Sequence, residues 1–314
     1  MSTPNIALYA GGPLGPTAIT QNLRATQQVG WTTIILSLFH IGNPNNVQGQ
    51  HWGDIIFNGA PMVVSQGKYV ADPSWPGNVA KLKQNSFITQ IYASFGGGIT
   101  VVDFTTIQTI YNNNNNSFSG TMLEKNFQVF RQTFPAIDGI DMDCEDNYDQ
   151  PSFVAFCQML IGMGFAITFC PYQDPSFWTG SLAALQQSNP GAVKWWNLQC
   201  YAGGNGNDPQ MWASAITQAI PKFPTDGFIV AGDWSRWYDK QQQQWNGDCP
   251  SAVTSLISSF AGESCFGGGF IWNMDQILTD GQNTAGCGAV ETMADYVKAL
   301  VNGMKTSQQK AKGK

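Results

Sequence analysis

The chain has 314 residues, of which 43% are hydrophobic and only 11% are charged, with a formal net charge of −6 and a pI near 4.8. A chain of this length and apolar content can bury the core of one large domain, and no shift in composition divides it in two. The acidic balance argues against nucleic acid or an anionic membrane as a partner. Eleven Trp and nine Tyr, with many Asn, Gln and Gly, suit a neutral partner such as a carbohydrate.

Short apolar or β-branched stretches alternate with helix-like stretches along the whole chain. Eight of the short stretches are predicted to be strands, at residues 6–10, 33–39, 88–94, 139–145, 166–170, 196–201, 228–233 and 269–272. Eight such βα units in a chain of this length predict an α/β fold, a single (β/α)8 TIM barrel.

The connections between the predicted strands also have recognisable features. After the second strand, residues 55–57 and 62–64 flank Asn58-Gly59-Ala60, which predicts a small inserted hairpin. The asparagine run 112–116 predicts a loop, whereas 121–134 has helical spacing. Only about thirty residues separate the last two strands, too few for an added α+β domain.

The two ends of the chain are polar or weakly apolar. The start lacks the basic and apolar segments of a standard export signal, and no apolar run could span a bilayer. We expect a chain without a membrane partner that is cytoplasmic, is released by an unconventional route, or has lost its signal. The predicted barrel domain covers residues 1–303, and the Lys-rich residues 304–314 are expected to form a disordered tail.

The seven cysteines are an odd number without metal-type spacing. No metal and no cofactor are expected. Most of the thiols are predicted to be free and buried. A disulfide between two of Cys249, Cys265 and Cys287 is left open, because spacing does not choose the pair.

The most informative stretch is 138–145, Asp-Gly-Ile-Asp-Met-Asp-Cys-Glu, which places four carboxylates in eight residues. Alternate side chains of a strand share a face, so Asp141, Asp143 and Glu145 point one way and the apolar residues between them point the other. Same-face acids lie roughly 6.5 to 7 Å apart, so in a poorly solvated cleft at least one should keep its proton. A carboxyl of this kind is the usual general acid for cleaving an acetal, which predicts a glycoside hydrolase with Glu145 as proton donor.

Three other interpretations of this stretch are a solvated acidic strand end, a calcium loop and a zinc site. A calcium loop is disfavoured because its sixth and twelfth positions, counted from Asp141, are Asp146 and Ser152 instead of Gly and Glu. Zinc is disfavoured because the chain has only two His. Asp138 is out of phase with the other acids, so we expect it to fix the loop that enters the strand.

In TIM barrels the active site lies at the carboxyl ends of the strands. Besides the acids, the residues predicted at those ends are Ser94 with Gly96 and Gly97, then Tyr172, Gln199, Tyr201, Asp233, Trp234 and Trp272, with Trp237 just beyond. Polar and aromatic side chains on one rim are what a sugar site requires. Packing in the barrel remains the alternative for Tyr201 and Trp272, and strand-end packing for Ser94.

Together these motifs resemble the glycoside hydrolase family 18 chitinases and the related endo-β-N-acetylglucosaminidases, in their compact plant and fungal branch, over nearly the whole barrel. Residues 138–145 match the family's fourth-strand signature, and the stretches 94–97, 199–201 and 268–272 are similar to its third, sixth and last strand motifs. Residues 6–9, which end in Tyr9, resemble its first strand. Two departures are Ala202 after Tyr201, and Gly232-Asp233-Trp234 at the end of the seventh strand.

The resemblance implies a role for each matched residue. Glu145 would protonate the glycosidic oxygen and later deprotonate water, while Asp143 would orient the acetamido group and stabilise an oxazolinium-like intermediate. Asp141 would share a proton or hydrogen bond with Asp143, and Tyr201 would hold the acetamido oxygen. Trp272 would be the floor under the sugar. The residues expected to contact substrate besides Trp272 are Tyr9, Ser94, Tyr172, Gln199, Asp233 and Trp234.

The function implied is endo-acting, retaining hydrolysis of β-1,4-linked N-acetylglucosamine polymers or oligomers, in which the substrate's own acetamido carbonyl attacks. The expected partner is chitin or another oligosaccharide that contains N-acetylglucosamine. Two alternatives are an endo-β-N-acetylglucosaminidase acting on N-glycan cores and a non-catalytic glycan-binding or inhibitor barrel. Membership of a toxin-type or other larger assembly is also left open.

Overall fold

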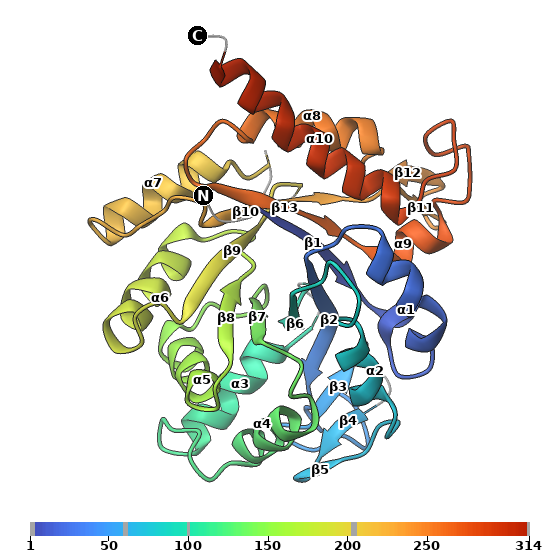
Figure 1. Ribbon diagram of the computed structural model, residues 1–314. Helices are drawn as coiled ribbons and strands as arrows, with labels where there is room; N and C mark the ends of the chain where they lie inside the picture. Colours follow the sequence, from blue (N-terminus) through green and yellow to red (C-terminus); the bar gives the residue numbers. More distant parts are fainter. Residues whose placement is uncertain (1–3, 59–61, 99–100, 202–205, 313–314) are drawn as a thin grey trace.

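The computed structural model describes residues 4–58, 62–98, 101–201 and 206–312, with side chains as far as Lys305. Eight parallel strands form a closed ring (Figure 1): β1 (Asn5–Ala10), β2 (Thr33–Ile41), β6 (Gln90–Gly96), β7 (Gly139–Asp143), β8 (Ala166–Phe169), β9 (Val193–Gln199), β10 (Ile229–Trp234) and β13 (Phe266–Trp272). The ring closes because β1 pairs with both β13 and β2. The predicted TIM barrel is confirmed, and each predicted strand is present with its ends shifted by a few residues.

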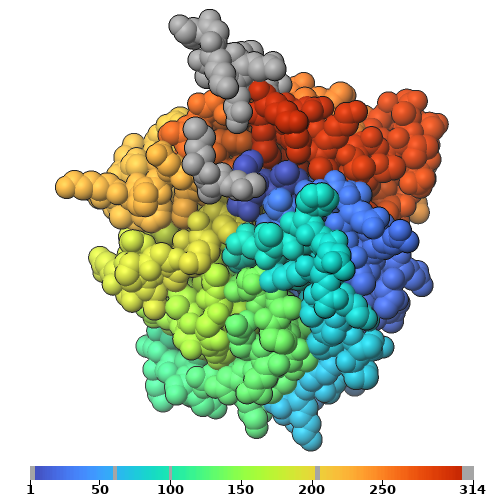
Figure 2. Space-filling model, in the orientation of Figure 1, coloured from blue at the N-terminus to red at the C-terminus, as the bar shows by residue number. Residues whose placement is uncertain are grey.

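Helices surround the ring (Figure 1): η1 (Gly12–Leu14), α1 (Ile19–Gln28), α2 (Trp75–Lys81), α3 (Asp103–Asn113), α4 (Met122–Thr133), α5 (Gln150–Gly162), α6 (Pro175–Ser188), α7 (Pro209–Ala219), α8 (Pro250–Phe260), α9 (Met274–Thr279) and α10 (Met293–Lys312). None of the helices in the described part of the chain combines the length and apolarity needed to cross a bilayer. The first strand and the last helix are neighbours, as the blue and red atoms of Figure 2 show.

One of the two predictions for the connection between the third and fourth barrel strands is confirmed and the other is corrected. The predicted helix at 121–134 is α4, and the Thr121 side chain accepts a hydrogen bond from the Glu124 N–H at its start. Helix α3 continues through Asn113, into the run that was predicted as a loop, and ends where Asn115 and Asn116 adopt φ values of 54° and 55°. Asn tolerates this left-handed conformation, so the second half of the run ends the helix.

The Lys-rich end was predicted to be disordered from residue 304. The backbone of α10 extends over this segment as far as Lys312. The boundary of the barrel domain at residue 303 stays a prediction.

The insertion after β2 is larger than a hairpin. Strands β3 (Ile55–Phe57) and β4 (Met62–Ser65) pair as predicted, β5 (Lys68–Tyr69) adds a third strand, and β3 pairs with the end of β2. All three residues of β3 are buried, so the insertion belongs to the core and lengthens β2 beyond its predicted end. The predicted turn residues Gly59 and Ala60 lie outside the described residues.

Side chains alternate between the two faces of the barrel strands. Outward-facing side chains pack against the helices, and the inward-facing apolar cluster contains Ala7, Tyr9, Ile35, Tyr92, Cys170, Trp195, Val230 and Phe270. Two aromatic side chains in this inner cluster, Tyr92 and Phe270, fit only because the residue facing each of them is a glycine. A Cβ at Gly139 would lie 2.3 Å from the Tyr92 ring, and one at Gly232 would lie 1.9 Å from the Phe270 ring. The barrel interior is therefore a packed core and not a pore.

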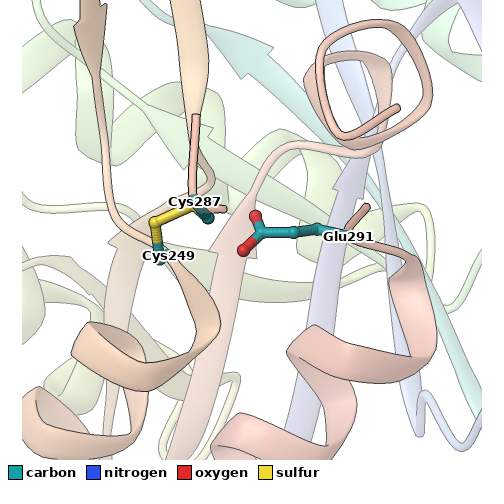
Figure 3. A group of neighbouring side chains, drawn as sticks. All are labelled: Cys249, Cys287 and Glu291. Carbon is teal, nitrogen blue, oxygen red and sulfur yellow. A yellow bond between two sulfur atoms is a disulfide. The ribbon is translucent and has the colours of Figure 1, made fainter. Parts of the chain in front are cut away.

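Between β10 and β13 the chain forms a short hairpin, β11 (Trp237–Asp239) and β12 (Gln244–Asn246), followed by α8, with no added domain. A disulfide joins Cys249, just before α8, to Cys287, and Glu291 points toward it (Figure 3). Both sulfurs are therefore used in a covalent bond and do not offer thiolate ligands to a metal. The cysteines described as free are Cys144, Cys157, Cys170, Cys200 and Cys265, all buried.

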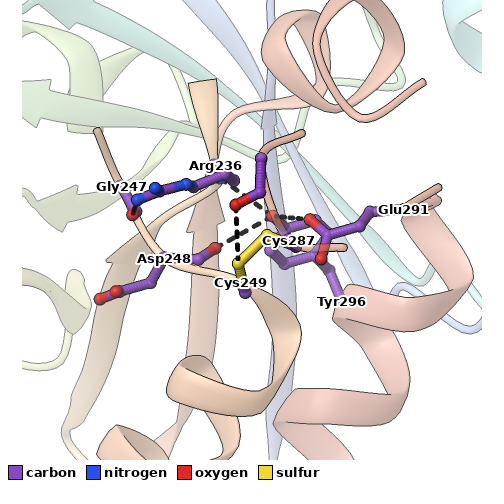
Figure 4. The surroundings of a disulfide bond; sticks show 8 residues. Arg236, Gly247, Asp248, Cys249, Cys287, Glu291 and Tyr296 are labelled. Atoms are coloured by element: carbon purple, nitrogen blue, oxygen red, sulfur yellow. Dashed lines mark hydrogen bonds between the residues drawn. A yellow bond between two sulfur atoms is a disulfide. The ribbon is translucent and has the colours of Figure 1, made fainter. Parts of the chain in front are cut away.

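Hydrogen bonds extend the disulfide region toward the end of β10 (Figure 4). The Tyr296 hydroxyl accepts from the Arg236 N–H at 2.9 Å and lies 3.0 Å from both the Asp248 carbonyl oxygen and Glu291 Oε2. One tyrosine of α10 thus ties together the segments on either side of the disulfide.

Removal of the disulfide should destabilise the fold. For a separation of 38 residues the chain-entropy estimate gives about 4 kcal/mol of the free energy of unfolding. The double variant Cys249→Ala/Cys287→Ala should therefore unfold at lower urea concentration than the wild type. A reducing agent should lower the stability of the wild type and leave the double variant unchanged; equal stability of the two oxidised proteins would contradict the prediction.

Candidate active site

The three acids of β7 and its extension lie on the inner face with increasing exposure toward the strand end. Asp141 is 0% exposed, Asp143 is 4% exposed, and Glu145 is half-buried. The residues between them, Met142 and Cys144, pack in the outer core. The predicted alternation is therefore present, and Glu145 is the acid that solvent reaches first.

Asp141 is held by four hydrogen-bond donors from four other strands. Its Oδ2 accepts from the Tyr9 hydroxyl at 2.9 Å and from Ser94 Oγ at 2.8 Å. Its Oδ1 accepts from Thr168 Oγ1 at 2.6 Å and from Asn197 Nδ2 at 2.9 Å. Burial raises the pKa of Asp141, and the four hydrogen bonds act in the opposite direction.

Tyr9 and Ser94 were expected to contact substrate. Both are instead buried partners of Asp141, with 1% and 0% of their surface exposed. Ser94 is in register with Asp141, and Tyr9 bonds to the same carboxyl. Both therefore lie deeper in the barrel than Asp143, which is in register with Gly96, two residues farther along β6.

Asp143 and Glu145 form a carboxyl pair. Gln199 Nε2 lies 3.1 Å from Asp143 Oδ1 and 3.0 Å from Glu145 Oε1, so one amide bridges both acids. Burial raises the pKa of Asp143 well above its usual range, and the charges of Glu145 and Asp141 and a hydrogen bond with Glu145 add to this. The buried pair therefore tends to retain a proton.

The expected proton sharing between Asp141 and Asp143 is not what the structure shows. The acceptor positions of Asp141 are already occupied by its four donors, and the carboxyl partner of Asp143 is Glu145. The neighbouring strands supply four donors to Asp141, whereas one Gln199 amide is shared by Asp143 and Glu145.

The glycine run after β6 wraps around the acid pair. Gly97 N–H donates to the Asp143 carbonyl oxygen at 2.8 Å, and Gly98 N–H donates to Glu145 Oε2 at 3.0 Å. Gly97 has a φ of +83°, and a Cβ there would lie 2.8 Å from Asp143 Oδ2. The sequence pointed to Gly96 and Gly97, whereas the donor role of Gly98 was missed because a backbone N–H carries no sequence signal.

The acids that flank this group have structural partners. Asp138 accepts from Lys83 Nζ at 2.6 Å and from the Ile91 N–H at 2.7 Å, which agrees with its predicted structural role. Asp146 accepts from the backbone N–H groups of Phe104 and Thr105 at the start of α3. Both acids stabilise the ends of elements and leave the inner face to the other three.

Aromatic side chains lie at the same rim. Tyr201 is half-buried, with its ring 5.6 Å from Trp234 and 6.3 Å from Phe270. Burial, with the nearby thiol of Cys170 and the charges of Asp143 and Glu145, raises the pKa of Tyr201, so its phenol remains a proton-bearing donor. Ala202 lies outside the described residues.

The remaining rim residues differ in their placement. Trp272 is half-buried, with its ring 5.4 Å from Tyr9 in an edge contact. Trp234 stacks on Trp237 at 5.2 Å, and its Nε1 donates to Gln276 Oε1. Tyr172 is half-buried on the loop after β8.

Asp233 faces away from the barrel interior. Its neighbours Gly232 and Trp234 face inward, so by strand alternation Asp233 faces the outer layer, where it is 1% exposed. Burial and the proximity of Asp248 raise the pKa of Asp233 to about 7. The expectation of a substrate contact is therefore corrected, because Asp233 is one residue out of phase with the inner face.

This placement predicts a pH dependence of stability. The folded state binds the Asp233 proton more tightly than the unfolded chain, whose Asp pKa is about 3.9, so stability declines between about pH 4 and pH 7 and stays low above. Asp233→Asn should remove up to about 4 kcal/mol of this decline and make the protein more stable than the wild type at pH 8. Urea denaturation at pH 5 and pH 8 measures it. The exposed control Asp226→Asn should follow the wild type; the same decline in Asp233→Asn would refute the assignment.

No family model and no curated protein sequence matches this chain. Solved structures do. A GH18 chitinase from Pseudoalteromonas aurantia has a TM-score of 0.60 and 14% identity over 95% of this chain and 99% of its own. The catalytic domain of a GH18 chitinase from the fern Peteris ryukyuensis has a TM-score of 0.55 and 17% identity over 95% and 98%. Human YKL-39, described as a pseudo-chitinase with retained chitooligosaccharide binding, has a TM-score of 0.62 and 10% identity over 96% and 100%. The chain therefore has the fold of the GH18 chitinases and chitinase-like proteins.

Proposed function

We propose that this chain is a glycoside hydrolase that cleaves β-1,4-linked N-acetylglucosamine chains internally and with retention, as a chitinase does. The observation that carries the proposal is the buried Asp143 beside the half-buried Glu145, bridged by Gln199 at the strand-end rim of the barrel. A carboxyl pair that retains a proton next to an ionised partner is the arrangement that general acid catalysis needs at neutral pH.

In the proposed first step the Glu145 proton passes to the glycosidic oxygen as the bond from C1 to that oxygen breaks. The acetamido oxygen of the bound sugar forms a new bond to C1, which gives an oxazolinium ion. The Tyr201 hydroxyl would donate to the acetamido oxygen, and the Asp143 carboxylate would accept from the acetamido N–H and stabilise the positive charge.

In the second step water attacks C1, its proton passes to Glu145, and the bond from C1 to the acetamido oxygen breaks. Two inversions at C1 give net retention. Trp272 and Trp234, both half-buried at the rim, would offer ring faces to the sugar, and Tyr172 on the neighbouring loop is a further candidate contact.

Two alternatives share parts of this chemistry. An endo-β-N-acetylglucosaminidase acting on N-glycan cores would use the same residues on a different glycan. A non-catalytic glycan-binding barrel is favoured by one observation, the fold similarity to human YKL-39, itself a pseudo-chitinase. The presence of Glu145, Asp143, Asp141 and Tyr201 together favours an enzyme.

The test is a substrate panel of chitin oligomers, insoluble chitin and high-mannose N-glycans. Internal cleavage of the chitin oligomers, with the β-anomer of the new reducing end appearing first by NMR, is expected. Cleavage confined to the N-glycans would establish the first alternative. Binding of the oligomers without turnover of any substrate would establish the second.

A further inference from the structure

A short helix after the last barrel strand links three segments of the strand-end rim. Helix α9 lies beside the end of β1 and the β11–β12 hairpin (Figure 1). The Asp275 carboxylate accepts from the N–H groups of Gly11 and Gly12, just after β1, at 2.8 and 2.9 Å. Asp280, at the end of the helix, accepts from the Tyr238 N–H of β11 at 3.3 Å. Helix α9 therefore holds parts of the rim in place relative to one another.

The third link is a side-chain hydrogen bond to the indole of Trp234, at the end of β10. Gln276 of α9 is half-buried, and its Oε1 accepts from Trp234 Nε1. The backbone N–H of Gln276 donates separately to Asn273 Oδ1 at 3.1 Å, which caps the start of the helix. The cap uses the backbone of Gln276, whereas its side chain holds Trp234. A side-chain substitution at this position therefore leaves the cap of α9 in place.

The backbone around Trp234 is fixed by a buried serine. Ser235 is 0% exposed, and its N–H donates to the Trp272 carbonyl oxygen at 2.7 Å. Its Oγ accepts from the Asn273 N–H at 3.1 Å. Strands β10 and β13 are in register here, with Trp234 opposite Trp272. The two tryptophans assigned to the sugar therefore leave adjacent strands at the same level of the rim.

The orientation of the Trp234 ring needs a further constraint. The ring stacks on Trp237 at 5.2 Å with an interplanar angle of 20°, and it lies 5.6 Å from the tilted ring of Tyr201. Stacking keeps the plane of an indole but allows the ring to turn over, because the torsion that leads to an aromatic ring has broad minima. A directional N–H bond is satisfied in only one of these orientations. The bond to Gln276 therefore selects the orientation of the Trp234 indole.

We infer that Gln276 is a positioning residue for glycan binding, which holds the Trp234 indole so that a sugar unit next to the one on Trp272 packs against it. The inference rests on the proposed function, in which both tryptophans contact the glycan. It assigns part of the affinity to a side chain that acts through Trp234 and not by contact with the sugar. The bond-breaking step uses Glu145 and Asp143, so it should not depend on Gln276.

The binding test compares two substitutions of Gln276. Gln276→Met keeps the length of the side chain and removes the acceptor, whereas Gln276→Glu keeps an acceptor. In calorimetry with a chitin hexamer, Gln276→Met should raise Kd about threefold to tenfold, because the hydrogen bond that orders an aromatic contact is lost. Gln276→Glu should stay within about twofold of the wild type. With fluorogenic chitotriose, Gln276→Met should raise KM and change kcat by less than about twofold.

A double-variant cycle separates this role from general damage to the rim. Trp234→Phe keeps an aromatic ring and removes the N–H, so Gln276→Met should weaken binding much less in that background than in the wild type. Gln158→Met is the matched control, because Gln158 Nε2 donates to Ser188 Oγ between the outer helices α5 and α6. Its Kd should equal that of the wild type.

Three results of these measurements would overturn the inference. The first is wild-type affinity in Gln276→Met. The second is an equal loss of affinity in Gln276→Glu and Gln276→Met. The third is full additivity of the losses caused by Gln276→Met and Trp234→Phe, since residues that act through one bond must be coupled.

A second readout does not depend on the glycan. Indole N–H groups give their own NMR resonances, and that of Trp234 is the one lost in Trp234→Phe. A hydrogen-bonded N–H resonates downfield and exchanges slowly with water, so Gln276→Met should move this resonance upfield and speed its exchange. An unchanged resonance would contradict the inference. If the wild type binds the hexamer but cleaves no substrate, the proposed hydrolysis is refuted and the affinities still decide the role of Gln276; if it binds no oligomer, both are refuted.

Discussion

Glu145→Gln is expected to lower turnover of chitin oligomers by roughly a thousandfold, because the amide has no acidic proton to give to the glycosidic oxygen. The substitution keeps the size of the side chain and its carbonyl oxygen, so Gln199 Nε2 retains an acceptor at this position. Glu145 is half-buried and its main polar contacts are Gln199 and Gly98, so the rest of the site should keep its shape. Binding of the same oligomers should stay within about threefold of the wild type, since a neutral isostere leaves the sugar contacts in place.

A fluorogenic chitotriose assay measures turnover, and calorimetry with chitin oligomers measures binding. The same substitution on helix α4, Glu124→Gln, is the control, because the Glu124 side chain accepts from the Gly120 N–H in the turn before the helix. It should keep full turnover. Retained hydrolysis in Glu145→Gln would refute the assignment of the acid, whereas loss of both turnover and binding would show that the substitution disturbs the site as a whole.

The two-residue period of a strand was sufficient to predict the arrangement of Asp141, Asp143 and Glu145. The same rule places Asp233 in the outer layer, but only once the inward position of Gly232 is known from the Phe270 ring that fills its place. Strand phase relative to the barrel axis is set by packing between distant strands. A residue named from its nearness to a strand end can therefore face either way.

Hydrogen-bond partners were the least predictable part of the site. Tyr9 and Asp141 are 132 residues apart in the chain, and Gln199 and Asp143 are 56 apart. Their contact depends on the register of six successive strands of the ring, from β1 through β2, β6, β7 and β8 to β9, which no local pattern specifies. For this reason the sequence predicted that three acids share one face but paired Asp143 with Asp141, whereas Gln199 links Asp143 to Glu145.

Tertiary packing also settled what cysteine spacing left open. Helices α8 and α10 pack side by side, which brings Cys249 before α8 close to Cys287 before α10, with a Cα–Cα distance of 5.8 Å. Cys265 is buried at the end of the turn that leads into β13 and stays free. Three cysteines in a loop-rich region allow three pairs, and only the helix packing selects one.

Asp143→Asn is expected to lower turnover by about a hundredfold or more, because the cyclised intermediate loses the nearest negative charge. The amide also cannot take part in the proton sharing with Glu145. The stability of Asp143→Asn, in contrast, should increase. Burial and the neighbouring carboxylates raise the pKa of Asp143 in the folded state, so its ionisation destabilises the fold above the usual Asp pKa. A neutral side chain avoids this cost, and the free energy of unfolding at pH 8 should rise.

The matched control lies five residues earlier in the same strand segment, where Asp138→Asn removes a charge that pairs with Lys83 and accepts from the Ile91 N–H. That variant should keep its turnover and lose about 1 kcal/mol of stability, the usual contribution of a partly exposed charged hydrogen bond. Kinetics with a fluorogenic chitotriose and urea denaturation at pH 8 measure both quantities for both variants. One acid is thus expected to support activity at the expense of stability, and the other stability alone. Equal losses of stability in the two variants would mean that Asp143 is held in place as a structural carboxylate and would contradict its proposed role.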